Sequence, residues 1–126
     1  MDHLTREPYF TKVDALRIKT LLTGSKGVVA HNFKYDRNVL LDQFARVGLP
    51  RLLDDSKLLR TRFCTQLGTF ESGHSQKENV SLAEAVKSVL GIDGYKGHKA
   101  KEDALASASL FLTLTQQHDG MLVYPW

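Results

Sequence analysis

Two aspartates open predicted amphipathic helices on the face that each helix turns toward the core. Asp36 and Asp103 each stand four residues before an apolar stripe, and residues four apart share one helix face. The stripes are Leu40, Phe44 and Val47 for the first, and Ser107, Leu110, Phe111 and Leu114 for the second. An uncompensated buried carboxylate is costly, so a helix-terminal amide, a basic partner or a divalent metal ion must accompany each. A place in the first turn alone is favoured by about 0.3 to 1 kcal/mol through the helix dipole.

A histidine and several cations lie near these aspartates in the sequence. His98 stands in a predicted flexible basic loop, Gly94-Tyr95-Lys96-Gly97-His98-Lys99. A lone histidine in such a loop is either a catalytic residue or, more commonly, simply exposed. The cations that could contact phosphate, or form an ordinary solvated basic face, are Lys34, Arg37, Lys96, Lys99 and Lys101.

Periodicity and capping residues predict the elements that must position these groups. Thr11 and Ser81 have the form of helix-capping boxes, and Val13, Leu16, Thr20 and Leu21 recur at helical spacing. The predicted helices are 11–24, 34–47, 81–90 and 103–116, with a helical turn or two between 57 and 63. The predicted short strands are 28–30 and 52–54. We expect an exposed loop at 69–79 and an apolar tail at 121–126 that packs as an edge strand or against a partner.

Composition indicates one soluble globular domain. The 126 residues are 42% hydrophobic and 25% charged with a net charge of +3, which is compatible with nucleic acid but does not require it. The single cysteine, Cys64, excludes an internal disulfide framework and suits a reducing compartment. We find neither an export signal nor an apolar run that could span a membrane, so we expect a cytoplasmic, intracellular protein without a membrane partner.

Two segments resemble motifs of the DEDDh exonucleases, the family of the bacterial polymerase III proofreading subunit. Residues 28–40 resemble the second motif, a strand that ends in His31-Asn32 before Asp36 opens a helix. Residues 98–104 resemble the third motif, in which His98 precedes Asp103 by five positions. Asp55-Ser56-Lys57-Leu58-Leu59-Arg60 and Ser81-Leu82 resemble further parts of the family in the same order, so the resemblance spans roughly residues 4–114.

The resemblance implies an α/β, ribonuclease-H-like fold with two divalent ions, Mg²⁺ or Mn²⁺, held by four acidic residues. Asp36 and Asp103 match two of these ligands, and His98 matches the general base. His31, Asn32, Phe33 and Lys99 fall where the family approaches the 3' end of single-stranded DNA or RNA. Phe33 is interpreted either as a stacking group or as part of the core.

The family's first motif, an Asp-x-Glu on the first strand of the sheet, occurs nowhere in this sequence. We therefore expect residues 1–126 to form a partial exonuclease domain, mostly helical, with about two short parallel strands, without the N-terminal three-strand meander, and with a tail at 119–126. Short parallel strands with open edges need cover, so another chain or an N-terminal segment should complete the sheet. A truncated protein, a split enzyme and a remnant used for binding all remain open.

The function expected from the resemblance is 3'-5' exonuclease activity by a two-metal mechanism, contributed by this chain as a fragment or subunit. The alternative is a non-catalytic nuclease-like module that binds nucleic acid or a polymerase-like partner. A third interpretation is a small helical interaction protein. Preference for DNA or RNA depends on contacts to the 2'-hydroxyl, which the sequence does not reveal.

Overall fold

The computed structural model describes residues 10–53 and 62–117. Two of its helices begin at the predicted capping boxes. Before α1 (Lys12–Thr23), the Thr11 hydroxyl accepts a hydrogen bond from the Asp14 N–H, and the Asp14 carboxylate accepts one from the Thr11 N–H. Ser81 and Glu84 pair in the same way before α4 (Leu82–Ala85). Because these bonds satisfy backbone N–H groups left free at a helix start, both helices begin as predicted.

The segment after α4 continues as a π-helical turn, Val86–Leu90, and ends at Gly91. Gly91 has a φ of 73°, a left-handed conformation that glycine adopts readily at a helix end. Ala85 and Val86 are buried, while Leu82, Val89 and Leu90 are partly buried against the core. The predicted helix over 81–90 is therefore confirmed, and its apolar residues face the core.

The remaining two long helices carry the predicted site aspartates. α2 spans Phe33–Arg46, close to its predicted range, and α5 spans Ala100–Gln117, beginning earlier than predicted. Three members of the predicted α5 stripe, Ser107, Leu110 and Leu114, are buried. In α2, Phe44 is buried as predicted, but Asp36 is exposed. The α2 stripe therefore leaves the core before it reaches Asp36.

Two short parallel strands form the sheet of the described chain. β1 is Val28–Ala30, as predicted, and β2 is Arg62–Cys64, paired so that Val29 lies beside Phe63. The prediction of the second strand at 52–54 is wrong for Leu52 and Leu53, which lie in a bend; the third residue of that range lies outside the described residues. Leu53 instead packs beside Phe44 in a hydrophobic cluster.

A helix also replaces the beginning of the predicted loop 69–79. α3 spans Thr65–Glu71, and Thr69 is buried with its hydroxyl donating to the Thr65 carbonyl at 2.6 Å. Gly68 permits the close approach of α3 to β2, because a Cβ there would lie 2.7 Å from Cζ of Phe63. Of the predicted helical turns over 57–63, Arg62 and Phe63 belong to β2, and 57–61 lie outside the described residues.

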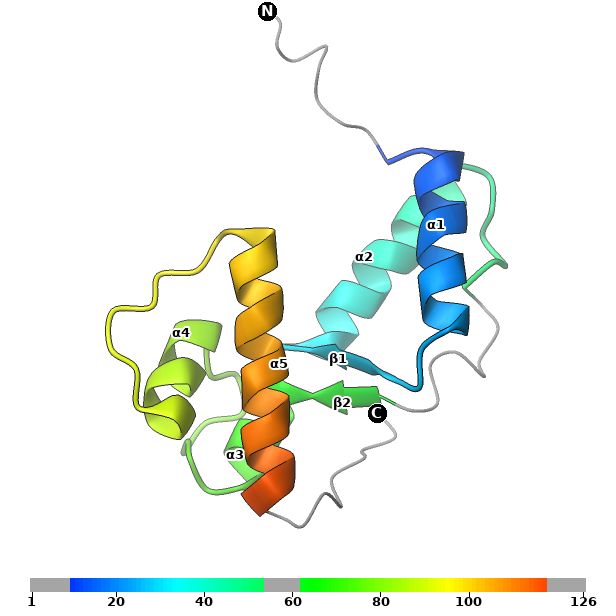
Figure 1. Cartoon of the computed structure of the whole chain (residues 1–126). Helices are drawn as coiled ribbons and strands as arrows, with labels where there is room; N and C mark the ends of the chain where they lie inside the picture. Colours follow the sequence, from blue (N-terminus) through cyan, green and yellow to red (C-terminus); the bar gives the residue numbers. More distant parts are fainter. Residues whose placement is uncertain (1–9, 54–61, 118–126) are drawn as a thin grey trace, which may run out of the picture.

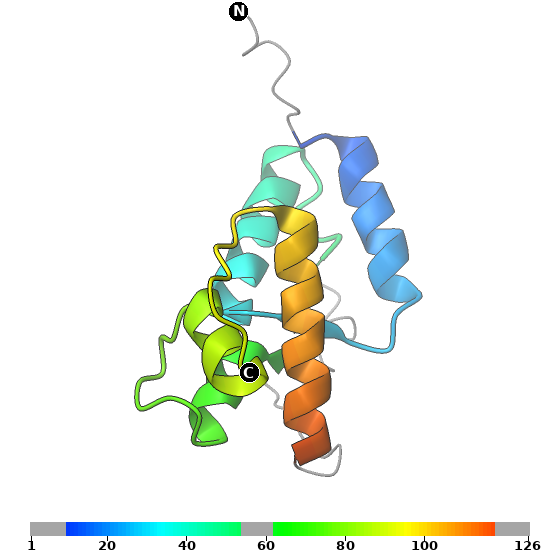
Figure 2. The ribbon, with the colours of Figure 1, turned by 60° about the vertical axis from the view of Figure 1, so that its left-hand side comes forward.

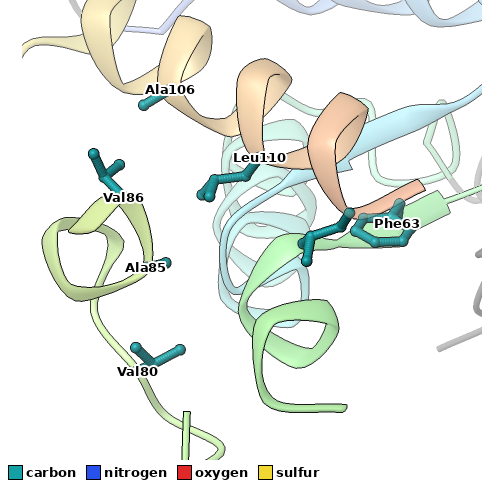
Figure 3. Close-up of a cluster of buried hydrophobic side chains, with 7 residues drawn as sticks. Phe63, Val80, Ala85, Val86, Ala106 and Leu110 are labelled. Carbon is teal, nitrogen blue, oxygen red and sulfur yellow. The ribbon is translucent and has the colours of Figure 1, made fainter. Parts of the chain in front are cut away.

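Side chains from β2, α4 and α5 make the larger hydrophobic cluster. Figure 3 shows Leu110 of α5 between Phe63 of β2 and the residues Ala85 and Val86. The ring of Phe63 also meets that of Phe111 edge to face, with centroids 5.1 Å apart. This cluster fixes the position of α5 relative to the sheet.

A second cluster joins α1 to α2 through Ala15, Phe44 and Leu53. The inward side of α1 is therefore Ala15 with Ile18 and Leu22. The stripe that gave α1 its predicted helical period faces outward instead: Val13 is 57% exposed, Leu16 53% and Leu21 73%. Helical spacing predicted the helix correctly, but the residues that revealed it are not its buried face.

The strands lie between two groups of helices. Figure 1 shows α1 and α2 on one side of the strands and α3, α4 and α5 on the other, and Figure 2 shows the same separation of α1 from α5 after rotation. The fold is thus α/β and mostly helical with two short parallel strands, as expected. No helix in the described ranges is long and apolar enough to cross a membrane. The expectations for 55–60 and 119–126 lie outside the described residues.

Candidate functional site

A hollow of about 750 Å³ lies where β1 ends, and both predicted aspartates line it. Its walls come from β1, from α2 with Asp36, from Leu82 of α4, and from α5 with Asp103. The α5 wall includes Ala100, Ala104 and Ala108, and His31 lies directly after β1. Ligands of open α/β sheets commonly bind beyond the carboxyl ends of the strands, which is where this hollow lies. The structure therefore brings together two of the three residues predicted to form the reactive centre.

Asp36 stands in the first turn of α2, directly after the β1-to-α2 connection. That connection bends sharply because Asn32, the residue before the helix, has a φ of 63°. The side chain of Asp36 is exposed on the wall of the hollow. The surrounding protein nevertheless removes enough water to raise the pKa of Asp36. A carboxylate that gains negative charge with difficulty favours a nearby cation.

Asp103 is half-buried, and both of its carboxylate oxygens accept hydrogen bonds from the loop before α5. The Tyr95 hydroxyl donates to Oδ1 in a short hydrogen bond, and the His98 main-chain N–H donates to Oδ2 at 3.1 Å. Gly97 leaves room for this arrangement, since a Cβ there would lie 3.2 Å from Oδ1. These two donors stabilise the negative charge of the half-buried carboxylate, which needs such a partner when it is removed from water.

His98 contacts the site through its main chain, and its side chain is exposed. Its ring is not among the groups that line the hollow. His98 has a φ of 74°, a left-handed conformation that costs a non-glycine residue about 1 to 2 kcal/mol. Asn32 and His98 are the two non-glycine residues with positive φ among the described residues. Such strain is common at functional sites. Asn32 and His98 are also two of the site residues that the sequence predicts.

His31 connects three parts of the fold at the rim of the hollow. Its Nε2 lies 2.8 Å from the Val80 carbonyl, which can only accept, so the ring proton sits on Nε2. Nδ1 lies within hydrogen-bond distance of the Thr65 hydroxyl, at 2.8 Å. Burial lowers the pKa of His31, against a smaller opposing effect of the hydrogen bond to Val80. Both ring nitrogens are engaged within the protein, which favours a positioning role over direct contact with substrate.

The other predicted substrate-binding residues are spread around the site. Phe33 is buried, with the Arg62 guanidinium 5.6 Å from its ring centroid, which favours the packing interpretation over nucleotide stacking. Asn32 is exposed and lines a different hollow, together with Phe33 and Lys34. Lys99 is exposed beside His98 but does not line the hollow that holds the aspartates.

Among the described residues, the charged groups that line this hollow are carboxylates. Asp36 and Asp103 are acidic, and none of the described lining residues is lysine or arginine. The cations predicted for phosphate contact, Lys34, Arg37, Lys96, Lys99 and Lys101, are therefore absent from its walls. A phosphate group entering the hollow would meet two negative charges at short range and would be repelled.

The fit of the described residues to a divalent cation is partial. Within residues 10–53 and 62–117, no group of three or more His, Cys, Asp or Glu side chains gathers closely enough to hold a metal ion. Asp36 and Asp103 supply hard oxygen ligands, and each Asp103 oxygen accepts one hydrogen bond from this chain and keeps a further lone pair. Mg²⁺ demands octahedral coordination and keeps several waters, so these two carboxylates fit a weak, water-rich site and no more.

Sequence reasoning missed Tyr95, Thr65 and Gly97 as supporting residues. Tyr95 belongs to the predicted flexible basic loop, outside the predicted helix that begins at Asp103, so no helical or strand pattern connects the two residues. Thr65 supports His31 from the start of α3, an element that the sequence did not predict. Two glycines close to a predicted site histidine were the one local signal of a tightly folded loop.

Comparison with known protein families, curated proteins and solved structures gave no match.

Proposed function

We propose that this chain is part of a metal-dependent 3'-5' exonuclease with a ribonuclease-H-like fold, in which Asp36 and Asp103 contribute to the metal site. The observation that carries the proposal is their position on one hollow at the end of β1. They come from helices far apart in the sequence, α2 and α5, and each belongs to a motif that resembles the same nuclease family.

The charge of the hollow supports a metal-dependent reaction of a polyanion. Two carboxylates, with no Lys or Arg among the described lining residues, would repel a phosphodiester, so in this proposal cations accompany the nucleic acid. Divalent ions held there would stabilise the attacking and leaving oxygens of an in-line phosphodiester cleavage. Partial desolvation by the surrounding protein raises the pKa of Asp36, which is consistent with a carboxylate that a bound cation would stabilise.

His98 is the proposed general base. Its strained backbone is held by Asp103 itself, through the hydrogen bond from the His98 N–H. The exposed imidazole is therefore tied to the metal-binding carboxylate while remaining accessible to water. Lys34, Lys96, Lys99 and Lys101 are also exposed, and in this proposal they contact the nucleic-acid backbone outside the hollow.

Two further surfaces support completion of the domain by another polypeptide segment. In the described chain the sheet has only two strands, so β1 has one edge without a strand partner there, and open edges readily accept a further strand. The outward stripe of α1, Val13, Leu16 and Leu21, is a second apolar surface in need of cover. In this proposal a segment carrying further carboxylates would cover these surfaces and raise the metal affinity.

The absence of a three-ligand cluster among the described residues favours a second candidate function. In that case the chain is a non-catalytic nuclease-like module that binds nucleic acid or a polymerase-like partner. It would retain binding to single strands through its exposed lysines but would release no nucleotides. Cleavage and binding measured on the same protein separate the two candidates.

The test is release of mononucleotides from 3'-labelled single strands of DNA and RNA in Mn²⁺. We expect release that falls at least about 100-fold in Asp36→Ala, Asp103→Ala and His98→Ala, the usual scale for a lost general base. Asp42→Ala is the matched control, since Asp42 is an exposed carboxylate of α2 outside the hollow. Binding without release would favour the second candidate, and equal release by all variants would indicate a contaminating nuclease and contradict the proposal.

A further inference from the structure

The loop between the π-helical turn and α5 is folded around the carboxylate of Asp103. Gly91, Gly94, Gly97 and His98 all have positive φ, so the chain turns repeatedly within this short stretch. It closes on Asp103 through the Tyr95 hydroxyl and the His98 N–H, one to each oxygen. The Asp103 N–H in turn donates to the Lys99 carbonyl at 2.8 Å. The loop thus hydrogen-bonds both carboxylate oxygens of Asp103, and the start of α5 fixes its main chain.

Tyr95 is the part of this arrangement that connects the carboxylate to the protein core. Its side chain packs against the cluster that contains Val86 and Leu110, while its hydroxyl reaches Oδ1 of Asp103. Gly97 leaves room for both groups, because a Cβ there would lie 3.4 Å from Cε2 of Tyr95 and 3.2 Å from Oδ1. A carboxylate that accepts a hydrogen bond at each oxygen is held in one orientation by these two donors.

We infer that Tyr95 is a positioning residue of the proposed metal site, which fixes the Asp103 carboxylate in a single orientation before a cation arrives. The inference rests on the proposed function, since it gives Asp103 a cation to bind. Each Asp103 oxygen uses one lone pair for the loop and retains another for a cation. Outer groups that hydrogen-bond a metal-binding carboxylate typically change metal affinity by about 10- to 100-fold when removed.

The decisive variant is Tyr95→Phe, which keeps the ring and its packing but removes the hydroxyl. Its matched control is Tyr35→Phe, because Tyr35 is 64% exposed on α2, does not line the hollow and lies outside the loop before α5. In the full chain, NMR side-chain couplings report the χ1 rotamer of Asp103, and hydrogen exchange reports protection of the His98 amide. We expect rotamer averaging and loss of amide protection in Tyr95→Phe and no change in Tyr35→Phe.

Titration with Mn²⁺ alone then separates positioning from general support of the fold. Paramagnetic broadening of the Asp103 signals should require about tenfold more Mn²⁺ in Tyr95→Phe. Cleavage by this variant should recover at high Mn²⁺, whereas cleavage by Asp103→Ala should not. A merely structural hydroxyl would change stability without shifting the Mn²⁺ midpoint.

Each result bears on one claim. A single Asp103 rotamer together with an unchanged Mn²⁺ midpoint in Tyr95→Phe would overturn the positioning inference and leave the nuclease proposal standing. Absence of any Mn²⁺ effect on Asp103 in the native protein would overturn the nuclease proposal, while rotamer averaging in Tyr95→Phe would still support the hold on the carboxylate. If Tyr95→Phe does not fold, Gly97→Ala displaces Oδ1 directly and should show the same averaging.

Discussion

The main-chain N–H of His98 donates to Oδ2 of Asp103 at 3.1 Å, and this hydrogen bond joins the two ends of the proposed third motif. It holds His98 at a φ of 74°, which only glycine adopts without cost. The imidazole itself is exposed, so packing does not explain why a histidine, and not glycine, occupies this strained position. Backbone strain at an exposed residue beside a candidate metal ligand is therefore a reason to test His98 for function.

Replacing His98 with glycine should separate stability from activity. His98→Gly relieves the strained φ, and the greater freedom of glycine in the unfolded chain opposes this gain. We expect the free energy of unfolding to rise by up to about 1 kcal/mol in urea denaturation, while nucleotide release is lost. Lys99→Gly, at the neighbouring exposed position with ordinary φ, should lower stability. Undiminished nucleotide release by His98→Gly would rule out His98 as the base.

Replacing Asp36 with asparagine should stabilise the protein at neutral pH and abolish its activity. Because the folded-state pKa of Asp36 is raised, its contribution is fully favourable below its unfolded pKa and is lost as pH rises through the raised value. At pH 7 the ionised carboxylate therefore opposes folding. We expect Asp36→Asn to raise the free energy of unfolding by less than about 1 kcal/mol at pH 7, because solvent screens this exposed group.

The gain in the free energy of unfolding should vanish at pH 3, where Asp36 of the unsubstituted protein is largely protonated in both the folded and the unfolded state. Asp42→Asn, on the same helix, is the control and should show no such pH-dependent gain. Added Mn²⁺ should reduce the difference at pH 7 by stabilising the native carboxylate. A lower free energy of unfolding for Asp36→Asn at pH 7 would show that this carboxylate supports the fold.

His31 should make the protein less stable in mild acid. Burial lowers its folded-state pKa, so its contribution is present above the unfolded pKa near 6.5 and is lost as pH falls through the lowered value. The native free energy of unfolding should therefore decrease from pH 7 to pH 5. His31→Gln should be less stable at pH 7 and should lack this part of the decrease.

The control for the acid response is His98→Gln, which removes an exposed imidazole and should retain the decrease. Urea unfolding of the three proteins at matched ionic strength measures these slopes. Parallel slopes for the native protein and His31→Gln would mean that the ring takes up a proton without disturbing its contacts with Thr65 and Val80.

Gly68 should tolerate no side chain. A Cβ at this position would lie 2.7 Å from Cζ and 2.9 Å from Cε1 of Phe63, and overpacking of this kind costs about 1 to 3 kcal/mol. We expect Gly68→Ala to lower the free energy of unfolding by that amount in urea. Gly24→Ala should have little effect, because its nearest new contact is an ordinary 3.6 Å. Equal stability of the two variants would show that α3 shifts easily away from β2.

Local signals determined the starts of α1 and α4 and the position of the first strand. The Thr11 and Ser81 capping boxes form between residues three positions apart, so a short stretch of sequence contains all the information they need. β1 is likewise a short apolar run between glycine-containing and polar segments. The second strand was misassigned because Leu52-Leu53 and Arg62-Phe63-Cys64 are both short candidates, and parallel pairing is decided by contacts distant in the sequence.

Packing alone decided which face of α1 is buried. Apolar residues occur on both sides of this helix, and the structure buries Ala15 while leaving Leu16 and Leu21 exposed. Likewise, the sequence identified Asp36 and Asp103 by their place before apolar stripes. Their meeting on one hollow, and the hold of Tyr95 on Asp103, depend on α2, the sheet and α5 packing together. Periodicity describes one element at a time, so only the tertiary structure could bring these side chains to one place.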